Sequence, residues 1–167
     1  MEQKGTGAIS EKAGARARRV RGWGFIVAYT AIAFVFAAFA TRFQFLGFPD
    51  VALSCFAALS LAGSYTYSLA VGIILGVIAE GISPGVIWVT PALYVLLASS
   101  SFYATRQMNL RTWSLAAYLV IWSAMFKILP PVFHGYGLNL LDATVGTLST
   151  AVLSYILLIP WTRGYLS

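Results

Sequence analysis

The chain has 167 residues, of which 59% are hydrophobic and only 10% are charged, and its formal net charge is +6. Soluble domains usually carry about 25% charged residues, so this composition excludes an ordinary soluble domain and indicates an integral membrane protein. The length suits one compact unit, and we expect an all-α bundle of about six transmembrane helices.

The positive charge is concentrated ahead of the first apolar segment. We expect residues 1–21 to form a flexible basic cytoplasmic arm and residues 22–167 to form the six-helix transmembrane domain. A basic segment beside a membrane helix typically marks the cytoplasmic side and contacts anionic lipids, which we favour over binding to nucleic acid. The basic side chains of this arm are Lys4, Lys12, Arg16, Arg18, Arg19 and Arg21.

The first apolar run, 23–40, is long enough for one bilayer crossing. Its end, Ala38-Phe39-Ala40, resembles a signal-peptidase site, which makes a cleaved signal peptide the alternative. The run is longer than the usual signal-peptide core of about 7 to 15 residues, and the basic arm before it is long. We therefore interpret it as an uncleaved first span.

Two helices are predicted next, joined by a tight turn. Pro49 and Asp50 open the first, because proline fits a first helical turn and an acid is favourable at the positive end of a helix. This helix, 51–62, is short for a span unless it continues through Gly63 and Ser64 toward Tyr67. The following helix, 68–82, carries glycines with a four-residue spacing, which in a membrane let a neighbouring helix approach closely.

The second half of the chain predicts three more spans, over 86–103, 113–129 and 141–161, with the fifth ending at a double proline. Six spans with a cytoplasmic amino terminus place the basic arm, the polar loop 106–111 and Arg163 on the cytoplasmic side. This distribution is the one that the positive-inside rule expects. A five-span arrangement would place either the middle loop or the carboxyl-terminal tail outside. We expect a multi-pass protein of the bacterial plasma membrane with both termini in the cytoplasm.

Four charged residues, Asp50, Glu80, Lys127 and Asp142, fall near predicted helix ends. We expect them to cluster in the outer half of the membrane if the second and third helices form a short or re-entrant hairpin, whereas two full crossings would move Glu80 inside. Asp50 and Asp142 suit helix starts, and we hypothesise that Lys127 is coupled to Glu80. The alternative is that the cluster lines an outward-facing pocket or grips a partner helix.

Small residues recur every four positions on three predicted helices. Such stripes usually mark contacts between helices of one chain and sometimes contacts with another chain. On the second interpretation, the partner-binding candidates are Gly72, Gly76, Glu80, Gly146 and Thr150, while Ala33 and Ala37 form a similar pair on the first helix.

The sequence contains few groups that could perform chemistry. Cys55 is the only cysteine and His134 the only histidine, which makes disulfides, thiolate sites and histidine zinc sites improbable. Nothing near His134 suggests a nucleophile and base, and no phosphate-binding, dinucleotide-binding or zinc-protease motif is present. We expect a protein that is not an enzyme and holds neither a metal nor a cofactor.

One stretch resembles a known family. Phe48-Pro49-Asp50 before a short helix, followed by Gly72, Gly76 and Glu80 at four-residue spacing and then Ser83-Pro84-Gly85, is similar to the rod shape-determining MreD family. The family usually has a basic residue where this chain has Phe48, and Asp where it has Glu80. The resemblance implies a non-catalytic scaffold of the cell-shape and peptidoglycan-elongation machinery, or elongasome. Its implied partners are an MreC-like membrane protein and, indirectly, an actin-like filament protein and a RodA-type synthase.

A second resemblance belongs to another class of protein. In size and in the small residues Ala33 and Ala37 of the first span, the chain is similar to substrate-capture subunits of energy-coupling-factor vitamin transporters. That resemblance implies an outward-facing pocket lined by the acids, together with Trp88 and His134. A membrane-embedded hydrolase or transferase has less support, because those reactions need a nucleophile with its base or a metal set.

Overall fold

The computed structural model describes residues 23–38, 49–80, 88–107, 112–133, 135, 137 and 139–165, except the side chains of 106, 107, 112 and 161–165. These residues form six helices and no strands, so the all-α prediction is confirmed for them. The basic arm with Arg16, Arg18, Arg19 and Arg21, and His134, lie outside the described residues. The helices are Trp23–Ala38, α2 Val51–Ala62, α3 Tyr65–Glu80, α4 Val89–Gln107, α5 Thr112–Phe133 and α6 Leu140–Tyr165.

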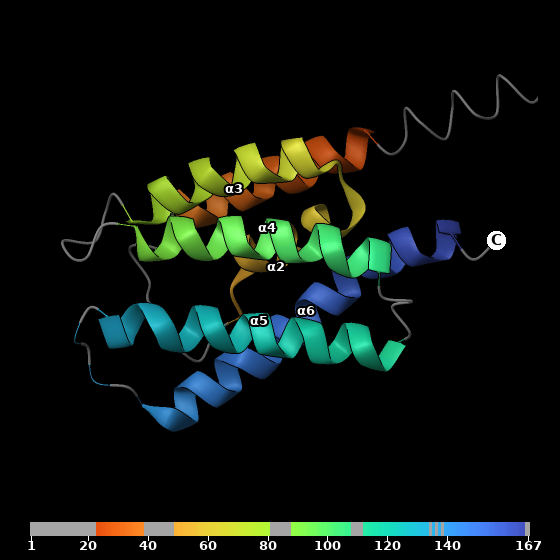
Figure 1. Ribbon diagram of the computed structural model, residues 1–167. Coiled ribbons are helices and arrows are strands. Elements are labelled where there is room, and N and C mark those ends of the chain that lie inside the picture. Colours follow the sequence, from red (N-terminus) through yellow and green to blue (C-terminus); the bar gives the residue numbers. More distant parts are fainter. Residues whose placement is uncertain are drawn as a thin grey trace, which may run out of the picture.

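Successive helices run in opposite directions along one bundle. Figure 1 shows α3 and α4 side by side in one layer, α5 and α6 in another, and α2 between them. The end of α3, the start of α4, the end of α5 and the start of α6 meet at one end of the bundle. The start of the first helix and the end of α6 lie at the opposite end, which places both ends of the described chain together.

Helix α2 is the centre of the molecule. Every residue from 52 to 60 is buried, because the helix is apolar or small on all sides and contacts α3, α4 and α6. Asp50 caps its start by accepting a hydrogen bond from the Leu53 N–H, and the helix ends at Gly63, whose N–H bonds to the Leu59 carbonyl. At 12 residues it is about 18 Å long, well short of a hydrocarbon core of about 30 Å.

Two helices are long and apolar enough to cross a membrane, judged by length and composition. They contain the stretches Trp113–Phe133 and Leu140–Pro160, each of 21 residues with a mean hydropathy of 1.6. The helices Trp23–Ala38, Val51–Ala62 and Tyr65–Glu80 are apolar but shorter. By this measure two of the six predicted spans are long enough to cross a membrane, and the prediction of six complete spans is not confirmed.

Most helices extend beyond the predicted bounds. The double proline was expected to end the fifth helix, but Pro130 and Pro131 lie inside α5, which continues to Phe133. Each proline removes one hydrogen bond to the carbonyl four residues earlier, but its φ of about −65° is helical, so the backbone of α5 continues through the pair for its last residues. In α4 the predicted position is confirmed, because Pro91 lies in the first turn, where the missing N–H matters least.

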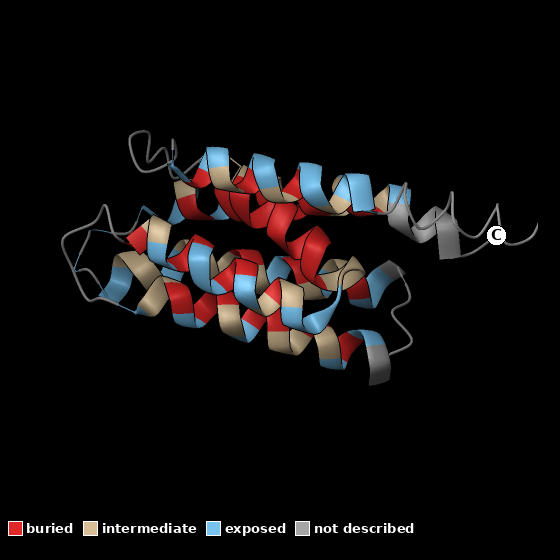
Figure 2. Cartoon of the chain, turned by 90° about the horizontal axis from the view of Figure 1, so that it is seen from above, coloured by how far each residue is buried: buried red, intermediate tan, exposed pale blue. Residues whose placement is uncertain are grey.

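The outside of the bundle is unusually apolar. Large aliphatic and aromatic side chains cover it, while the interior combines a hydrophobic core with buried hydroxyl groups, among them those of Ser54, Ser68, Ser101, Thr150 and Ser154. Figure 2 shows the buried residues between the helices and the exposed ones along the outer faces. Water would make such an apolar surface unfavourable, while lipid chains would cover it without penalty.

Candidate functional site

Glu80, the carboxylate that the sequence leaves without a neighbour, caps another helix. It is the last residue of α3 and is only 7% exposed. Its Oε2 accepts a hydrogen bond of 2.9 Å from the backbone N–H of Thr90, the second residue of α4. The first N–H groups of a helix have no partner within it, and they form its positive end. Glu80 therefore satisfies one of these groups across the α3–α4 turn.

The glycines of α3 serve the same contact. A Cβ added to Gly76 would lie 2.4 Å from Pro91 Cα, and one added to Gly72 would lie 2.8 Å from Phe56 Cζ. Gly72, Gly76 and Glu80 thus form one face of α3 that packs on α4 and α2. This small-residue stripe is therefore in contact with helices of the same chain. A partner helix could reach it only by displacing α4 or α2.

The small-residue face of α6 packs on α2. The Asp50 N–H donates to Thr150 Oγ1 over 2.9 Å, and Ser54 Oγ donates to the Thr150 carbonyl over 3.2 Å. Thr150 Oγ1 in turn donates to the Gly146 carbonyl over 2.6 Å. Thr150 is fully buried, and Gly146 is buried as well. These two partner-binding candidates therefore lie inside the chain's own bundle.

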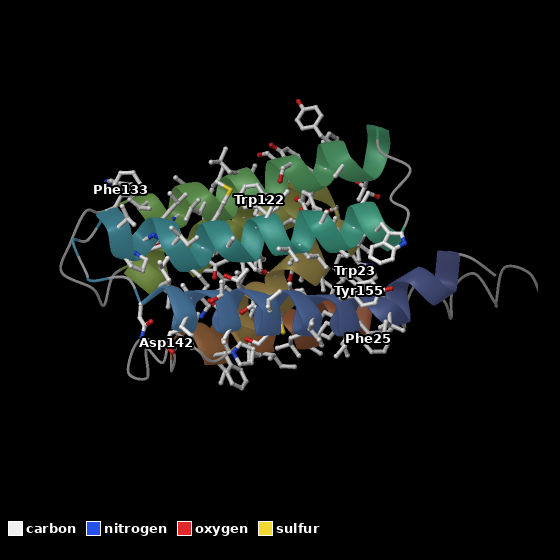
Figure 3. The ribbon with its side chains drawn as sticks, turned by 90° about the horizontal axis from the view of Figure 1, so that it is seen from below. Trp23, Phe25, Trp122, Phe133, Asp142 and Tyr155 are labelled. Atoms are coloured by element: carbon white, nitrogen blue, oxygen red, sulfur yellow. The ribbon has the colours of Figure 1, made fainter. Side chains whose placement is uncertain are left out.

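Three of the four charged residues lie toward one end of the bundle, whereas Asp50 lies beside the middle of α6, where its N–H is bonded to Thr150. Asp50 precedes α2, Glu80 ends α3, Lys127 lies in the last third of α5, and Asp142 lies in the first turn of α6. Figure 3 shows Asp142 and Phe133 at the end opposite Trp23. The expectation that a full crossing would move Glu80 to the other side is wrong, because two antiparallel helices return the chain to its starting end whatever their length. A re-entrant hairpin is not required for this grouping.

Asp50 and Glu80 are each held by a hydrogen bond to another helix. Asp142 accepts a hydrogen bond of 2.9 Å from the Asn139 side chain, and Asn139 Oδ1 accepts from the Leu141 N–H, so these residues shape the start of α6. Lys127 is partly buried near the end of α5. Its coupling to Glu80 stays a prediction.

A second polar cluster was missed by the sequence analysis. Ser60 Oγ donates to the Ala57 carbonyl over 3.0 Å, so the 2.9 Å bond between Ser60 and Ser101 takes its proton from Ser101. The Tyr118 hydroxyl is hydrogen-bonded to Ser101 Oγ over 2.8 Å and to Ser100 Oγ over 2.7 Å, and Ser100 Oγ also donates to the Leu97 carbonyl over 3.0 Å. This chain of hydroxyls joins α5, α4 and α2. The serine run 99–101 inside an apolar span was the signal that could have found it.

The described residues contain no group of three or more His, Cys, Asp and Glu side chains that could hold a metal ion. Cys55 is a buried free thiol on α2. Comparison with protein-family models, with curated proteins and with solved structures finds no match to this chain.

Proposed function

We propose that the chain is a multi-pass protein of the bacterial plasma membrane and acts as a non-catalytic scaffold of the cell-shape and peptidoglycan-elongation machinery. The observation that carries the membrane part is the apolar exterior of the bundle, which large aliphatic and aromatic side chains cover. The scaffold part rests on the resemblance around the glycine helix, whose Gly72, Gly76 and Glu80 form one continuous helix-packing face.

Charge supports an orientation for this protein. All but two of the 11 lysine and arginine residues belong to segments that adjoin the bundle end where the first helix begins, α4 ends, α5 begins and α6 ends. The exceptions are Arg42 and Lys127, while Glu80 and Asp142 lie toward the other end and Asp50 lies beside the middle of α6. Cytoplasmic segments carry the excess of basic residues, so we place the basic end in the cytoplasm and the acidic end outside.

A partner helix would have to use the exposed faces of the bundle. The small-residue faces of α3 and α6 are filled by the chain's own helices, so the partner cannot lie where the stripes alone suggested. α6 has a long exposed apolar face, and its side chains recur every three or four residues over most of the apolar stretch. They are Leu141, Val145, Leu148, Val152 and Ile156. We propose that an MreC-like transmembrane helix packs along this face.

Site-specific photo-crosslinking in the native membrane tests this function. A photoreactive residue at Leu148, which is exposed, should capture a coiled-coil membrane protein with a single transmembrane helix. The same residue at Leu119, which is 2% exposed, is the matched control and should capture no partner. Purification with a bound vitamin and no such partner would support the transporter interpretation and overturn the scaffold.

A further inference from the structure

The two layers of the bundle differ in the length of their apolar surfaces. α5 and α6 each contain an apolar stretch of 21 residues, about 32 Å long, which matches a hydrocarbon core of about 30 Å. α3 has 16 residues and is about 24 Å long. α4 has 19 residues, but its last three, from Thr105 to Gln107, are polar. The α3–α4 layer is therefore apolar over a shorter length than the α5–α6 layer.

Exposed aromatic side chains mark both ends of the α3–α4 layer. Tyr103, near the end of α4, is 61% exposed, and Trp88, directly before α4, is 68% exposed. The ring of Phe102 contacts those of Tyr65 and Tyr103 at centroid distances of 4.8 and 5.8 Å, which joins the start of α3 to the end of α4. Tryptophan and tyrosine concentrate at the two interfaces of a membrane. On this layer the rings of Trp88 and Tyr103 place the interfaces about 22 Å apart, at the helical rise of about 1.5 Å per residue.

Neither capping nor packing accounts for the tryptophan at position 88. Trp88 occupies the cap position of α4, because its carbonyl accepts a hydrogen bond of 3.0 Å from the Ala92 N–H. Small polar residues are preferred at such a position, and Glu80 provides the side-chain cap instead. The backbone of Trp88 also has a φ of 104°, which is unfavourable for a bulky residue. A large and mostly exposed ring at this position is accounted for if it anchors the chain at a membrane interface.

The surface between these two levels suits lipid chains. Ser99 and Ser100 of α4 are half-buried, and their hydroxyls donate to carbonyls of the same helix over 2.9 and 3.0 Å, so they do not require water. The large side chains that α3 and α4 expose between the two levels are aliphatic and 42 to 53% exposed. They are Ile73, Ile74, Val77 and Leu96.

The α5–α6 layer has a longer exposed surface. Trp113 and Phe133 of α5 are 87% and 56% exposed and lie about 30 Å apart along the helix. Figure 1 shows α4 and α5 nearly antiparallel, so a tilt of the whole bundle would shorten both surfaces along the membrane normal. The difference of about 8 Å between the two layers would therefore persist at any tilt.

We propose that the bilayer is thinned locally along the α3–α4 layer and that this layer selects phospholipids with short acyl chains. A surface shorter than the hydrocarbon core is matched by thinning of the surrounding bilayer, and short-chain lipids reduce the cost of this thinning. The α5–α6 layer matches a bilayer of ordinary thickness, so the two sides of the bundle differ in the lipids that they select. This inference rests on the membrane placement proposed above and not on the scaffold role.

Quenching of a fluorophore by nitroxide-labelled lipids in liposomes tests the proposal. The fluorophore is attached to Leu96→Cys on α4 or to Ile121→Cys on α5, two positions that are 53% and 59% exposed. Cys55 is buried, and the unsubstituted chain measures any background labelling. The bilayer is a mixture of dimyristoleoyl- and dieicosenoyl-phosphatidylcholine, and either lipid carries the nitroxide in turn. The ratio of short-chain to long-chain quenching should be about twofold higher at Leu96 than at Ile121.

A variant with a longer apolar surface tests the cause of this preference. Tyr103→Leu combined with Thr105→Leu removes an interfacial ring and a hydroxyl from the end of α4, and both positions are exposed. The preference for the short-chain lipid at Leu96 should then fall toward the value at Ile121.

Equal quenching ratios at the two positions, or a preference for the long-chain lipid at Leu96, would overturn the proposal. A short-chain preference that the double variant leaves unchanged would also contradict it. If aqueous iodide quenched both positions and neither lipid did, the membrane placement itself would be wrong. Loss of the photo-crosslink at Leu148 with the lipid preference intact would overturn the scaffold and leave the lipid selection standing.

Discussion

The contact between Gly76 and Pro91 allows a sharp test of the packing. In Gly76→Ala, the new Cβ would lie 2.4 Å from Pro91 Cα, 2.8 Å from Pro91 N and 3.0 Å from Pro91 Cβ, whereas ordinary contacts lie at 3.4–4 Å. Two of these are rigid backbone atoms, so α4 would have to move away by about 1 Å. Overpacking of this kind costs about 1–3 kcal/mol.

The same movement would weaken the cap that Glu80 provides for α4. Loss of a cap costs about 1 kcal/mol, so we expect Gly76→Ala to lower the free energy of unfolding by about 2–4 kcal/mol in total. Titration of the detergent-solubilised protein with sodium dodecyl sulfate, followed by circular dichroism, measures this change.

Gly24→Ala is the matched control for this substitution, since no atom lies within 4 Å of its added Cβ. It should leave the stability unchanged or raise it by up to about 1 kcal/mol, because alanine is the better helix former. Equal stabilities of the two alanine variants would refute the close approach of α3 and α4.

Three further substitutions test the polar contacts. Glu80→Ala should destabilise the protein by about 1–2 kcal/mol, because the Thr90 N–H loses its acceptor, and Glu80→Gln should restore most of this loss. Thr150→Val should cost about 1–3 kcal/mol in the same titration, because it leaves the Asp50 N–H unsatisfied, and an equal loss in exposed Thr144→Val would contradict this reasoning. Tyr118→Phe should cost about 1 kcal/mol, and if thermal unfolding showed no loss, the hydroxyl chain would contribute no stability.

The start of α2 could be predicted from local signals alone, because Asp50 is a strong start signal that acts within the first turn of the helix. The predicted helix, 51–62, has the limits of the observed one, Val51–Ala62. The sequence left open a continuation through Gly63 and Ser64 toward Tyr67, and the structure decides against it, since the helix ends at Ala62 and a new one begins at Tyr65.

The helix that packs against the glycines of α3 could not be predicted in the same way. The glycines of α3 indicate that some helix approaches closely, but spacing within one helix carries no information about which helix it is. The chain folds so that α4 returns along α3, and only this return places Pro91 against Gly76 and the Thr90 N–H against Glu80. The observed neighbour of Glu80 is thus a backbone group, which sequence patterns do not reveal.

The sequence by itself determined the helical class, the apolar character and the distribution of basic and acidic residues along the chain, since these depend on composition and on local spacing. The tertiary structure decided which faces are buried, because burial depends on how helices far apart in the sequence pack together. It placed the backbone N–H of Asp50 against Thr150 in the middle of α6, and Pro91 and the Thr90 N–H of α4 against Gly76 and Glu80 of α3.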